Sequence, residues 1–314
     1  MGYLQIQWQR GRKIYGKRSW RETRRTFLHT MRSIRNKREI EALENYFASY
    51  TPDPTLLDRQ VGLFELMTRY FLFKSSTPQE RLEAIVNHFD YLKDIFTDEA
   101  IREMYSVDPD NFYDDVSRMN RGYIVWESED LDMVARLYYG PGQRKEGFLT
   151  LLLTLGKQGV YHANFRFGKG FNGESAMWIG TIQGYKDGLE RAKKITKKMY
   201  GYRPKNFITF LIREIGRAAQ VESILAVSDE GFYANSHMVR GNKAKVAILD
   251  TLWEDIGGTV LESDPNYFTI PLEEERKPME EIKSQKRSQY RNRYALLDEY
   301  EAMIQENIKP YVKA

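Results

Sequence analysis

The sequence contains no cysteine and only four histidines among its 314 residues. Without cysteine the chain has no disulfide bond, no thiol nucleophile and no thiolate ligand for zinc, and four scattered histidines offer little to another soft metal. We therefore expect no bound metal. The P-loop, the Gly-x-Ser-x-Gly elbow and the His-Glu-x-x-His motif are also missing, so neither a hydrolase nor a kinase is expected.

Long apolar segments are absent as well. The longest strongly apolar run, residues 147–156, is about half as long as the roughly 20 residues that a membrane-spanning helix needs. The basic residues near the N-terminus are not followed by the apolar stretch of roughly 7 to 15 residues that marks a secretory signal. With 41% hydrophobic residues the chain can still bury a sizeable core. We expect a cytoplasmic protein.

Positive charge is concentrated at the start of the chain. Residues 1–40 contain twelve Lys and Arg residues against Glu22 and Glu39, a net charge of +10, so the remainder carries −6 of the overall +4. Such a segment attracts anionic lipid, other phosphates or an acidic face of the same protein. We expect this basic arm to attach the protein peripherally to the inner membrane rather than to bind nucleic acid specifically. A solvated basic helix is the open alternative.

The pattern of apolar residues predicts an α+β, or mixed α/β, protein in four parts. Residues 1–40 form the basic arm, in which Trp20, Phe27, Met31 and Ile34 fit one helical stripe. Helical spacing continues through residues 41–136. Residues 137–273 contain short alternating segments between glycine-containing turns, which predicts a mixed sheet with flanking helices. Residues 274–314 form a C-terminal helix.

The strand segment "GVYHANFRFG" alternates with a period of two. Its polar face carries His162, Asn164 and Arg166, and aromatic residues dominate the other face. This alternation predicts a strand with only one buried face. His162 is a candidate base near neutral pH, although a lone histidine is more often structural.

A corner between two helices is the strongest candidate for a phosphate site. A strand ends in "QG", a lysine-rich helix follows and stops at Gly201, and a second helix begins with "RPKN". Glycine suits the left-handed end of the first helix, and proline suits the start of the next, whose N-terminus is electropositive. The candidate cofactor-binding residues are Gln183, Gly184, Gly201, Arg203, Lys205 and Asn206. An ordinary helix–turn–helix corner without a ligand explains the same residues.

The polar loop "SDEGFYANSH" follows a predicted apolar strand. Loops beyond strand ends often carry function, and this one offers Tyr233 and His237 as candidate acid and base residues. We assign the catalytic role to these two residues.

The order of the predicted elements, four strands, helix, strand, helix and two strands, resembles that of acyl-CoA-dependent N-acyltransferases. The resemblance implies that pyrophosphate binds where the fourth strand leads into the next helix, and that a tyrosine near position 233 protonates the leaving thiolate. It therefore implies coenzyme A or acyl-CoA as a cofactor.

Four segments, "WIGTIQG", "TKKMYGYRPKNF", "LWEDIGG" and "KRSQYRNRYALLDE", resemble the VirK/YbjX family of Gram-negative bacteria. The resemblance implies a virulence or envelope-stress protein linked to outer-membrane integrity and antimicrobial peptide resistance, without an agreed chemical activity. Two hypotheses follow. One is an acyl-CoA-dependent transferase acting on an amine or hydroxyl of an envelope precursor or another small molecule. The other is a non-enzymatic accessory protein that binds anionic membrane or a protein partner.

Overall fold

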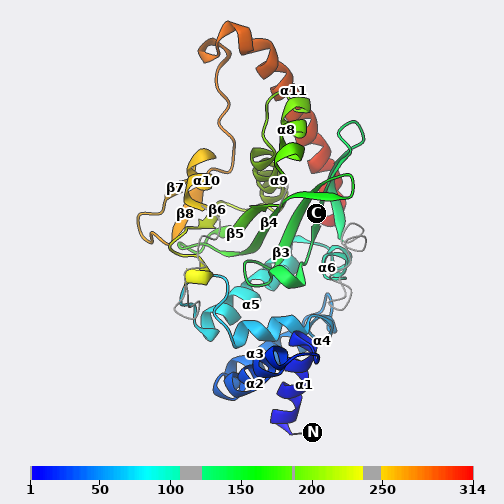
Figure 1. Cartoon of the computed structure of the whole chain (residues 1–314), viewed down its shortest axis with the longest axis vertical. Helices are drawn as coiled ribbons and strands as arrows, with labels where there is room; N and C mark the ends of the chain where they lie inside the picture. The colour runs from blue at the N-terminus through cyan, green and yellow to red at the C-terminus, as the bar shows by residue number, and fades with distance from the viewer. Residues whose placement is uncertain (1, 107–121, 186–187, 236–248, 314) are drawn as a thin grey trace.

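The computed structural model describes residues 2–106, 122–185, 188–235 and 249–313. Its mixed α/β architecture confirms the predicted fold class: a helical N-terminal part, a mixed sheet with flanking helices, and a long C-terminal helix (Figure 1). In this view helices α1 to α5 lie below the sheet, and α8, α9 and α11 lie above it.

The helices of the first part follow the predicted spacing. Their bounds are α1 Tyr3–Tyr15, α2 Trp20–Arg35, α3 Lys37–Ala48, α4 Leu56–Arg59, the 3-10 helix η1 Val61–Met67, α5 Pro78–Ile95 and α6 Asp98–Met104. Helix α5 begins as its sequence predicts. The Thr77 hydroxyl accepts a hydrogen bond from the Glu80 amide at 3.2 Å, the Glu80 carboxylate accepts one from the Thr77 amide at 2.7 Å, and Pro78 occupies the first helical position.

Helix α2 turns its polar side inward. Its buried residues are Thr26, His29, Thr30 and Ser33. Helix α1 packs closely against them, because Gly11 has no side chain: a Cβ there would lie 2.9 Å from the Thr26 methyl group. The predicted stripe is therefore on the outside, with Trp20 80% and Phe27 53% exposed and Met31 and Ile34 also exposed.

The sheet begins earlier than predicted. Strand β1 (Tyr123–Ser128) and most of β2 (Met133–Tyr138) lie in the range whose spacing predicted helix, up to residue 136. Trp126 of β1 is fully buried against Phe207 and Tyr300, on two helices above the sheet. A strand with large buried residues on both faces does not alternate simply between apolar and polar residues. The spacing of its apolar residues alone therefore does not distinguish it from a helix.

The described residues form an eight-stranded sheet in the order β1-β2-β3-β4-β5-β6-β8-β7. The remaining strands are β3 Leu149–Leu155, β4 Gln158–Lys169, β5 Ser175–Gly184, β6 Ser223–Val227, β7 Thr259–Val260 and β8 Tyr267–Ile270. Only β5 and β6 pair in parallel, and they are joined by α8 (Leu189–Lys198) and α9 (Pro204–Ala218). Their pairing ends at Ile179 and Ala226, whereas β5 continues to Gly184 paired with β4 alone.

The second half also contains the 3-10 helices η3 Pro141–Gln143, η4 Tyr233–Asn235, η5 Met279–Glu281 and η6 Lys309–Tyr311, with α10 Leu249–Asp255 and α11 Ser284–Ile308. Helix α11 carries basic residues first and acidic residues last, against the preference of the helix dipole. Ion pairs stabilise this order, since Asp298 pairs with Arg276 and Glu301 pairs with Arg217 of α9. None of the described helices is both long enough and apolar enough to cross a membrane.

Candidate functional site

The polar face of β4 is buried, contrary to the expectation of one exposed face. His162 and Arg166 are each 9% exposed and Asn164 is not exposed at all. Asn164 lies opposite Thr150 of β3 and Thr181 of β5, and His162 lies opposite Gln183. These polar side chains therefore form adjacent rows on one sheet face.

A chain of hydrogen bonds connects this face to a buried carboxylate. The Thr150 hydroxyl donates to Asn164 Oδ1 at 2.9 Å, and Asn164 Nδ2 donates to Glu146 Oε2 at 3.0 Å. Lys145 Nζ lies 3.9 Å from Glu146 Oε1. Asn164 thus holds the Glu146 carboxylate over the sheet.

Glycine allows the loop before β3 to reach this position. Gly180 is the extra residue where the β4–β5 register shifts, and a Cβ on it would lie 1.8 Å from the Glu146 carbonyl oxygen. A Cβ on Gly147 would lie 2.5 Å from the Phe165 amide nitrogen. Any larger residue at either position would force the loop, and Glu146 with it, away from the sheet.

Several polar atoms on this face lack a hydrogen-bond partner among the described residues. They are both ring nitrogens of His162 and the hydroxyl of Thr181. Burial lowers the pKa of His162 to about 4, with a further contribution from Lys145, so its ring is neutral at pH 7. Buried polar atoms without partners are uncommon and are often completed by water or a ligand. The position of these atoms beside Glu146 marks this face as a candidate active site.

The pKa values of Glu146 and Tyr233 are both raised. Burial raises the pKa of Glu146, despite the opposing effects of Lys145 and Asn164. Burial followed by the charge of Glu146 raises the pKa of Tyr233, which keeps its phenol protonated. Tyr233 packs edge-on against Phe71, and Lys145 Nζ lies 5.9 Å from its ring centroid. A carboxylate base and a phenolic acid are therefore neighbours in this region.

The predicted corner is a real cavity of about 510 Å³. Gly201 has a φ of +80°, as a left-handed helix end requires, and Arg203, Lys205 and Asn206 line the cavity with it. Helix α11 supplies the opposite wall with Lys286, Gln289, Tyr290 and Arg293. This wall was not predicted, because it comes from a segment far away in the sequence.

Backbone amides contribute less to the corner than the sequence suggested. Pro204 has no N–H, and the amides of Asn206 and Phe207 donate to the Arg203 carbonyl at 2.9 and 3.0 Å. Lys205 is paired with Asp255 of α10. The cations left to face an anion here would be Arg203, Lys286 and Arg293, of which Arg293 already donates to the Tyr200 carbonyl at 3.1 and 2.8 Å.

The structure separates the other predicted residues from this corner. Gln183 and Gly184 end β5, opposite His162 and Tyr161, and they do not line the corner cavity. Gln183 instead belongs to the row of polar residues on the sheet. His237 lies outside the described residues. The cofactor and catalytic assignments of these residues stay predictions.

Sequence reasoning missed Glu146 entirely. It stands in "GPGQRKEGF", which reads as a solvated charged turn, and only the contact with Gly180 some 30 positions later buries it. In the described ranges no group of three His, Asp or Glu side chains is arranged to hold a metal.

Comparison with known proteins places the chain among uncharacterised bacterial proteins. A family described as "Protein of unknown function (DUF535)" matches residues 18–306. The "Uncharacterized protein YbjX" of Escherichia coli (strain K12) is 27% identical over 258 residues, covering 77% of this chain and 71% of that protein. An "Uncharacterized protein" of Haemophilus influenzae is 24% identical over 314 residues, covering 96% of each chain. As its sequence motifs predicted, the chain belongs to the VirK/YbjX family, DUF535.

Proposed function

We propose that this protein is an acyl-CoA-dependent transferase that acylates an amine or hydroxyl group of an envelope precursor. The observation that carries the proposal is that β5 and β6 stop pairing before β5 ends. No strand among the described residues pairs with the β6-facing edge of residues 180–184 of β5, which lies beside the buried row of polar groups. An unpaired strand edge accepts an extended, amide-containing chain such as the arm of coenzyme A.

Two residues supply the proton transfers. Acyl-CoA supplies the acyl group and leaves as a thiolate. Glu146 takes the proton from the attacking amine or hydroxyl as the new bond to the acyl carbon forms, and Tyr233 gives its phenolic proton to sulfur as the C–S bond breaks. A proton returned from Glu146 to Tyr233 through solvent restores both groups. The raised pKa values of the two residues suit these roles.

The corner at Gly201 supplies the phosphate contacts. Because β5 and β6 are parallel, the crossover helix α9 runs back between them, and its N-terminus lies at the end of the sheet where β5 finishes. Arg203, Lys286 and Arg293 line this corner and provide cations for a pyrophosphate. The envelope-related acceptor, a virulence role and resistance to antimicrobial peptides are proposals drawn from the family resemblance alone.

Arg203→Ala is expected to weaken coenzyme A binding by roughly tenfold or more, because a charge-assisted hydrogen bond to phosphate contributes about 1.5–3 kcal/mol. Arg203 is exposed, so the melting temperature should hardly change. Calorimetric titration with coenzyme A and with pyrophosphate measures the effect. Lys197→Ala is the matched control, since Lys197 is an exposed cation of α8 outside the corner cavity. If the wild type binds neither compound, the corner is an ordinary turn and the transferase proposal fails.

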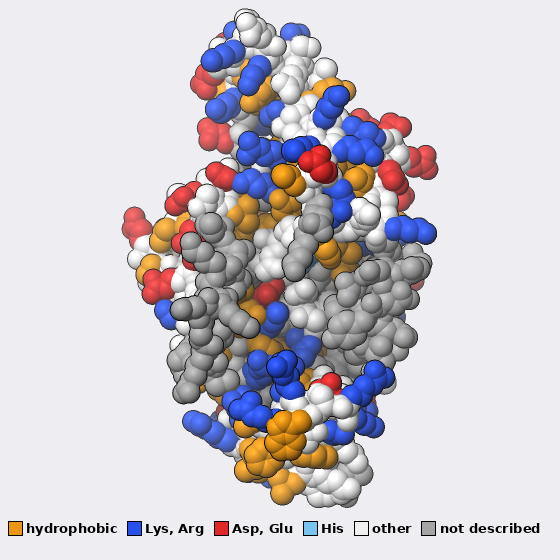
Figure 2. Space-filling view, viewed as in Figure 1, with side chains coloured by type: hydrophobic (Ala, Val, Ile, Leu, Met, Phe, Trp, Pro, Cys, Tyr) orange, Lys and Arg blue, Asp and Glu red, His pale blue; other side chains and the backbone are white. Residues whose placement is uncertain are grey.

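A second candidate function, docking to anionic membrane, is favoured by the outward-facing stripe of α2. Figure 2 shows hydrophobic side chains gathered at the lower end of this face, over α1 and α2, with Lys and Arg around them. Arg24 falls in the same stripe as Trp20 and Phe27. Apolar residues flanked by arginines are typical of helices that lie in the lipid headgroup region. The two functions are compatible, because a peripheral enzyme reaches acceptors at the membrane surface.

Trp20→Ala and Phe27→Ala are each expected to lower the affinity for anionic vesicles about tenfold, since full burial of a large apolar side chain contributes about 1.5–3 kcal/mol. Co-sedimentation with phosphatidylglycerol-containing vesicles at two salt concentrations measures this loss. Leu189→Ala serves as control, because Leu189 of α8 is 69% exposed and lies outside the N-terminal face. Equal losses of vesicle affinity in all three variants, or an affinity that does not depend on salt concentration, would contradict a specific docking face.

A further inference from the structure

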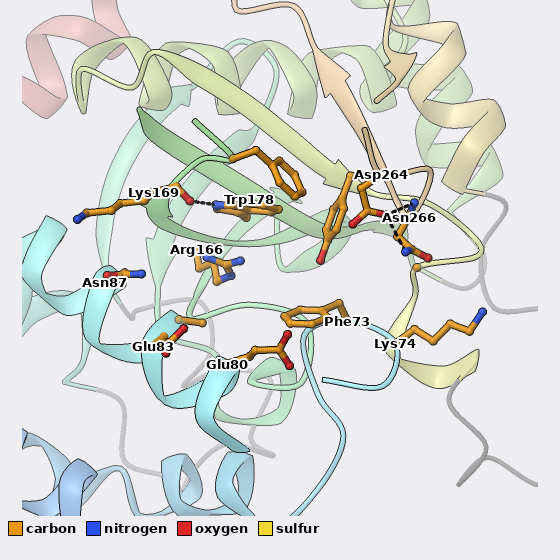
Figure 3. Close-up of a pocket in the computed structure, with 14 residues that line it drawn as sticks. Phe73, Lys74, Glu80, Glu83, Asn87, Arg166, Lys169, Trp178, Asp264 and Asn266 are labelled. Atoms are coloured by element: carbon orange, nitrogen blue, oxygen red, sulfur yellow. Dashed lines mark hydrogen bonds between the residues drawn. The ribbon is translucent and has the colours of Figure 1, made fainter. Parts of the chain in front are cut away.

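A second cavity, of about 360 Å³, lies between α5, the end of β4 and strand β8 (Figure 3). Its lining combines charged and polar side chains with four aromatic ones. Trp178, Phe171 and Tyr267 contact one another with ring centroids 5.1 to 5.5 Å apart, and Phe73 lies on the opposite side. The cavity therefore offers apolar surfaces to a flat molecule.

Arg166 occupies the middle of this cavity, beneath Trp178 (Figure 3). Its guanidinium carbon lies 4.5 Å from the centroid of the Trp178 ring. The side chain is nine-tenths buried, yet it makes no hydrogen bond or ion pair with any residue in the described ranges. Burial lowers the pKa of Arg166 to about 10, so the group is still charged at pH 7.

Two other buried arginines among the described residues make direct polar contacts, although the Nε of Arg144 has no partner there. Arg213 donates to the carbonyls of Pro271 and Ile256 at 2.9 and 2.8 Å, and Arg144 pairs with Glu65. Because the guanidinium is a fork of five donors, a buried and unpaired one is unfavourable unless an anion completes it. Arg166 differs from these two because its guanidinium lines the cavity and donates to no described residue.

The acidic residues around the cavity are already engaged with other partners. Glu80 caps α5, Glu83 accepts from Gln79 at 2.9 Å, and Asp264 accepts from Asn266 at 2.7 Å. Their three negative charges nevertheless equal in number the three positive charges of the lining, on Lys74, Arg166 and Lys169. A lining without net charge that includes three carboxylates favours a singly charged anion over a phosphate dianion.

We propose that this cavity binds a small aromatic carboxylate, which Arg166 holds as a bidentate pair while its ring lies against Trp178 and Phe171. Arginine matches the geometry of a carboxylate with two parallel hydrogen bonds. The site goes beyond the proposed transfer reaction, in which Arg166 has no part. It lies next to that region, because Asn164 and Arg166 are two positions apart on β4, about 7 Å.

The probe for this site is 4-fluorobenzoate, observed by fluorine NMR with the full-length protein. We expect saturable binding to the wild type, at least tenfold weaker binding of the neutral 4-fluorobenzyl alcohol, and weaker binding of 4-fluorophenyl phosphate. Arg166→Gln should lower the affinity for 4-fluorobenzoate at least tenfold. A thermal melt of the variant checks that it is folded. Lys169→Gln, which alters an exposed cation at the mouth, should change the affinity by no more than about twofold.

The proposal is overturned by any of three results. The first is the absence of saturable 4-fluorobenzoate binding to the wild type. The second is equal or tighter binding of the alcohol or the phosphate, which requires no variant and so decides the question even if Arg166→Gln fails to fold. The third is unchanged binding in a folded Arg166→Gln variant.

Discussion

Glu146→Gln is expected to lower the rate of acyl transfer by about 10²- to 10⁴-fold while stabilising the folded protein at pH 7. The loss of rate follows because an amide cannot accept the proton of the attacking group. The rest of the site should stay in place. Glutamine has nearly the same shape as glutamate, and its side-chain oxygen still accepts the hydrogen bond from Asn164.

The gain in stability follows from the sign of the pKa shift. Burial raises the pKa of Glu146 above its ordinary value, so the folded protein holds this proton more tightly than the unfolded chain does. The ionised carboxylate therefore destabilises the fold, and stability falls as the pH rises through the raised pKa. Replacement by glutamine removes this penalty. The advantage of the variant should be present at pH 7 and should disappear below about pH 4, where the carboxyl is protonated in both states.

Urea unfolding of wild type and Glu146→Gln at pH 7 and pH 4 measures the stability difference, and an acyl-CoA consumption assay measures the rate. Glu230→Gln is the control, because Glu230 is an exposed carboxylate paired with Lys74. Full activity in Glu146→Gln would exclude this residue as the base. A loss of stability at pH 7 would mean that the Lys145 contact outweighs the cost of burial.

The corner at Gly201 could be predicted because its signals are local. A glycine with positive φ and a proline at a helix start are separated by only three positions, so the chain order alone brings Gly201, Arg203 and Lys205 together. The pairing of Lys205 with Asp255 and the approach of Arg293 depend on packing between elements far apart in the sequence. Spacing within one helix contains no information on either contact.

The amphipathic stripe of α2 illustrates a different limit. Its period was predicted correctly, and so was the membership of Trp20, Phe27, Met31 and Ile34. Periodicity identifies two faces of a helix but does not say which one the protein buries. Here the small polar residues around His29 pack inward, against Gly11 and Thr68, which leaves the apolar stripe outside.

The polar face of β4 was predicted from its alternation, but its burial was not. Glu146 reaches Asn164 because Gly180 has no side chain and leaves room for the loop that carries Glu146. Arg166 is enclosed by α5 and β8, which are both far from β4 in the sequence. The functional candidates are thus polar residues that a simple alternating strand would expose to water. The expectation of an exposed face failed at the residues that now form the two candidate sites.

The protein is expected to lose stability between pH 7.5 and pH 5, because three histidines are buried in their neutral form. Burial lowers the pKa of His29 and of His162 to about 4 and places that of His88 well below its usual value. His88 is held neutral by its contacts: the Phe167 amide donates to Nδ1 at 3.0 Å, and Nε2 lies 2.8 Å from the Tyr105 hydroxyl.

The direction of the effect is set by the unfolded chain. Its histidines take up protons below about pH 6.5, whereas the folded protein does not until about pH 4, so the stability present above pH 6.5 is lost as the pH falls. At pH 5 the loss is about 2 kcal/mol each for His29 and His162, and His88 adds to it in the same direction, against a typical total stability of about 5–15 kcal/mol. Carboxyl groups with raised pKa values, such as Glu146 and Glu214, oppose this loss.

Urea unfolding at pH 7.5, 6 and 5 measures the loss in the free energy of unfolding. The variant His162→Phe isolates the contribution of His162 from those of the other two histidines. His162 has no hydrogen bond to lose, and phenylalanine fills a similar volume without a titrating group. The variant should therefore lose about 2 kcal/mol less than the wild type between pH 7.5 and pH 5. A wild type that is equally stable at the two pH values would contradict the burial of neutral histidines. An unchanged slope in His162→Phe would show that folding leaves the pKa of His162 at its unfolded value.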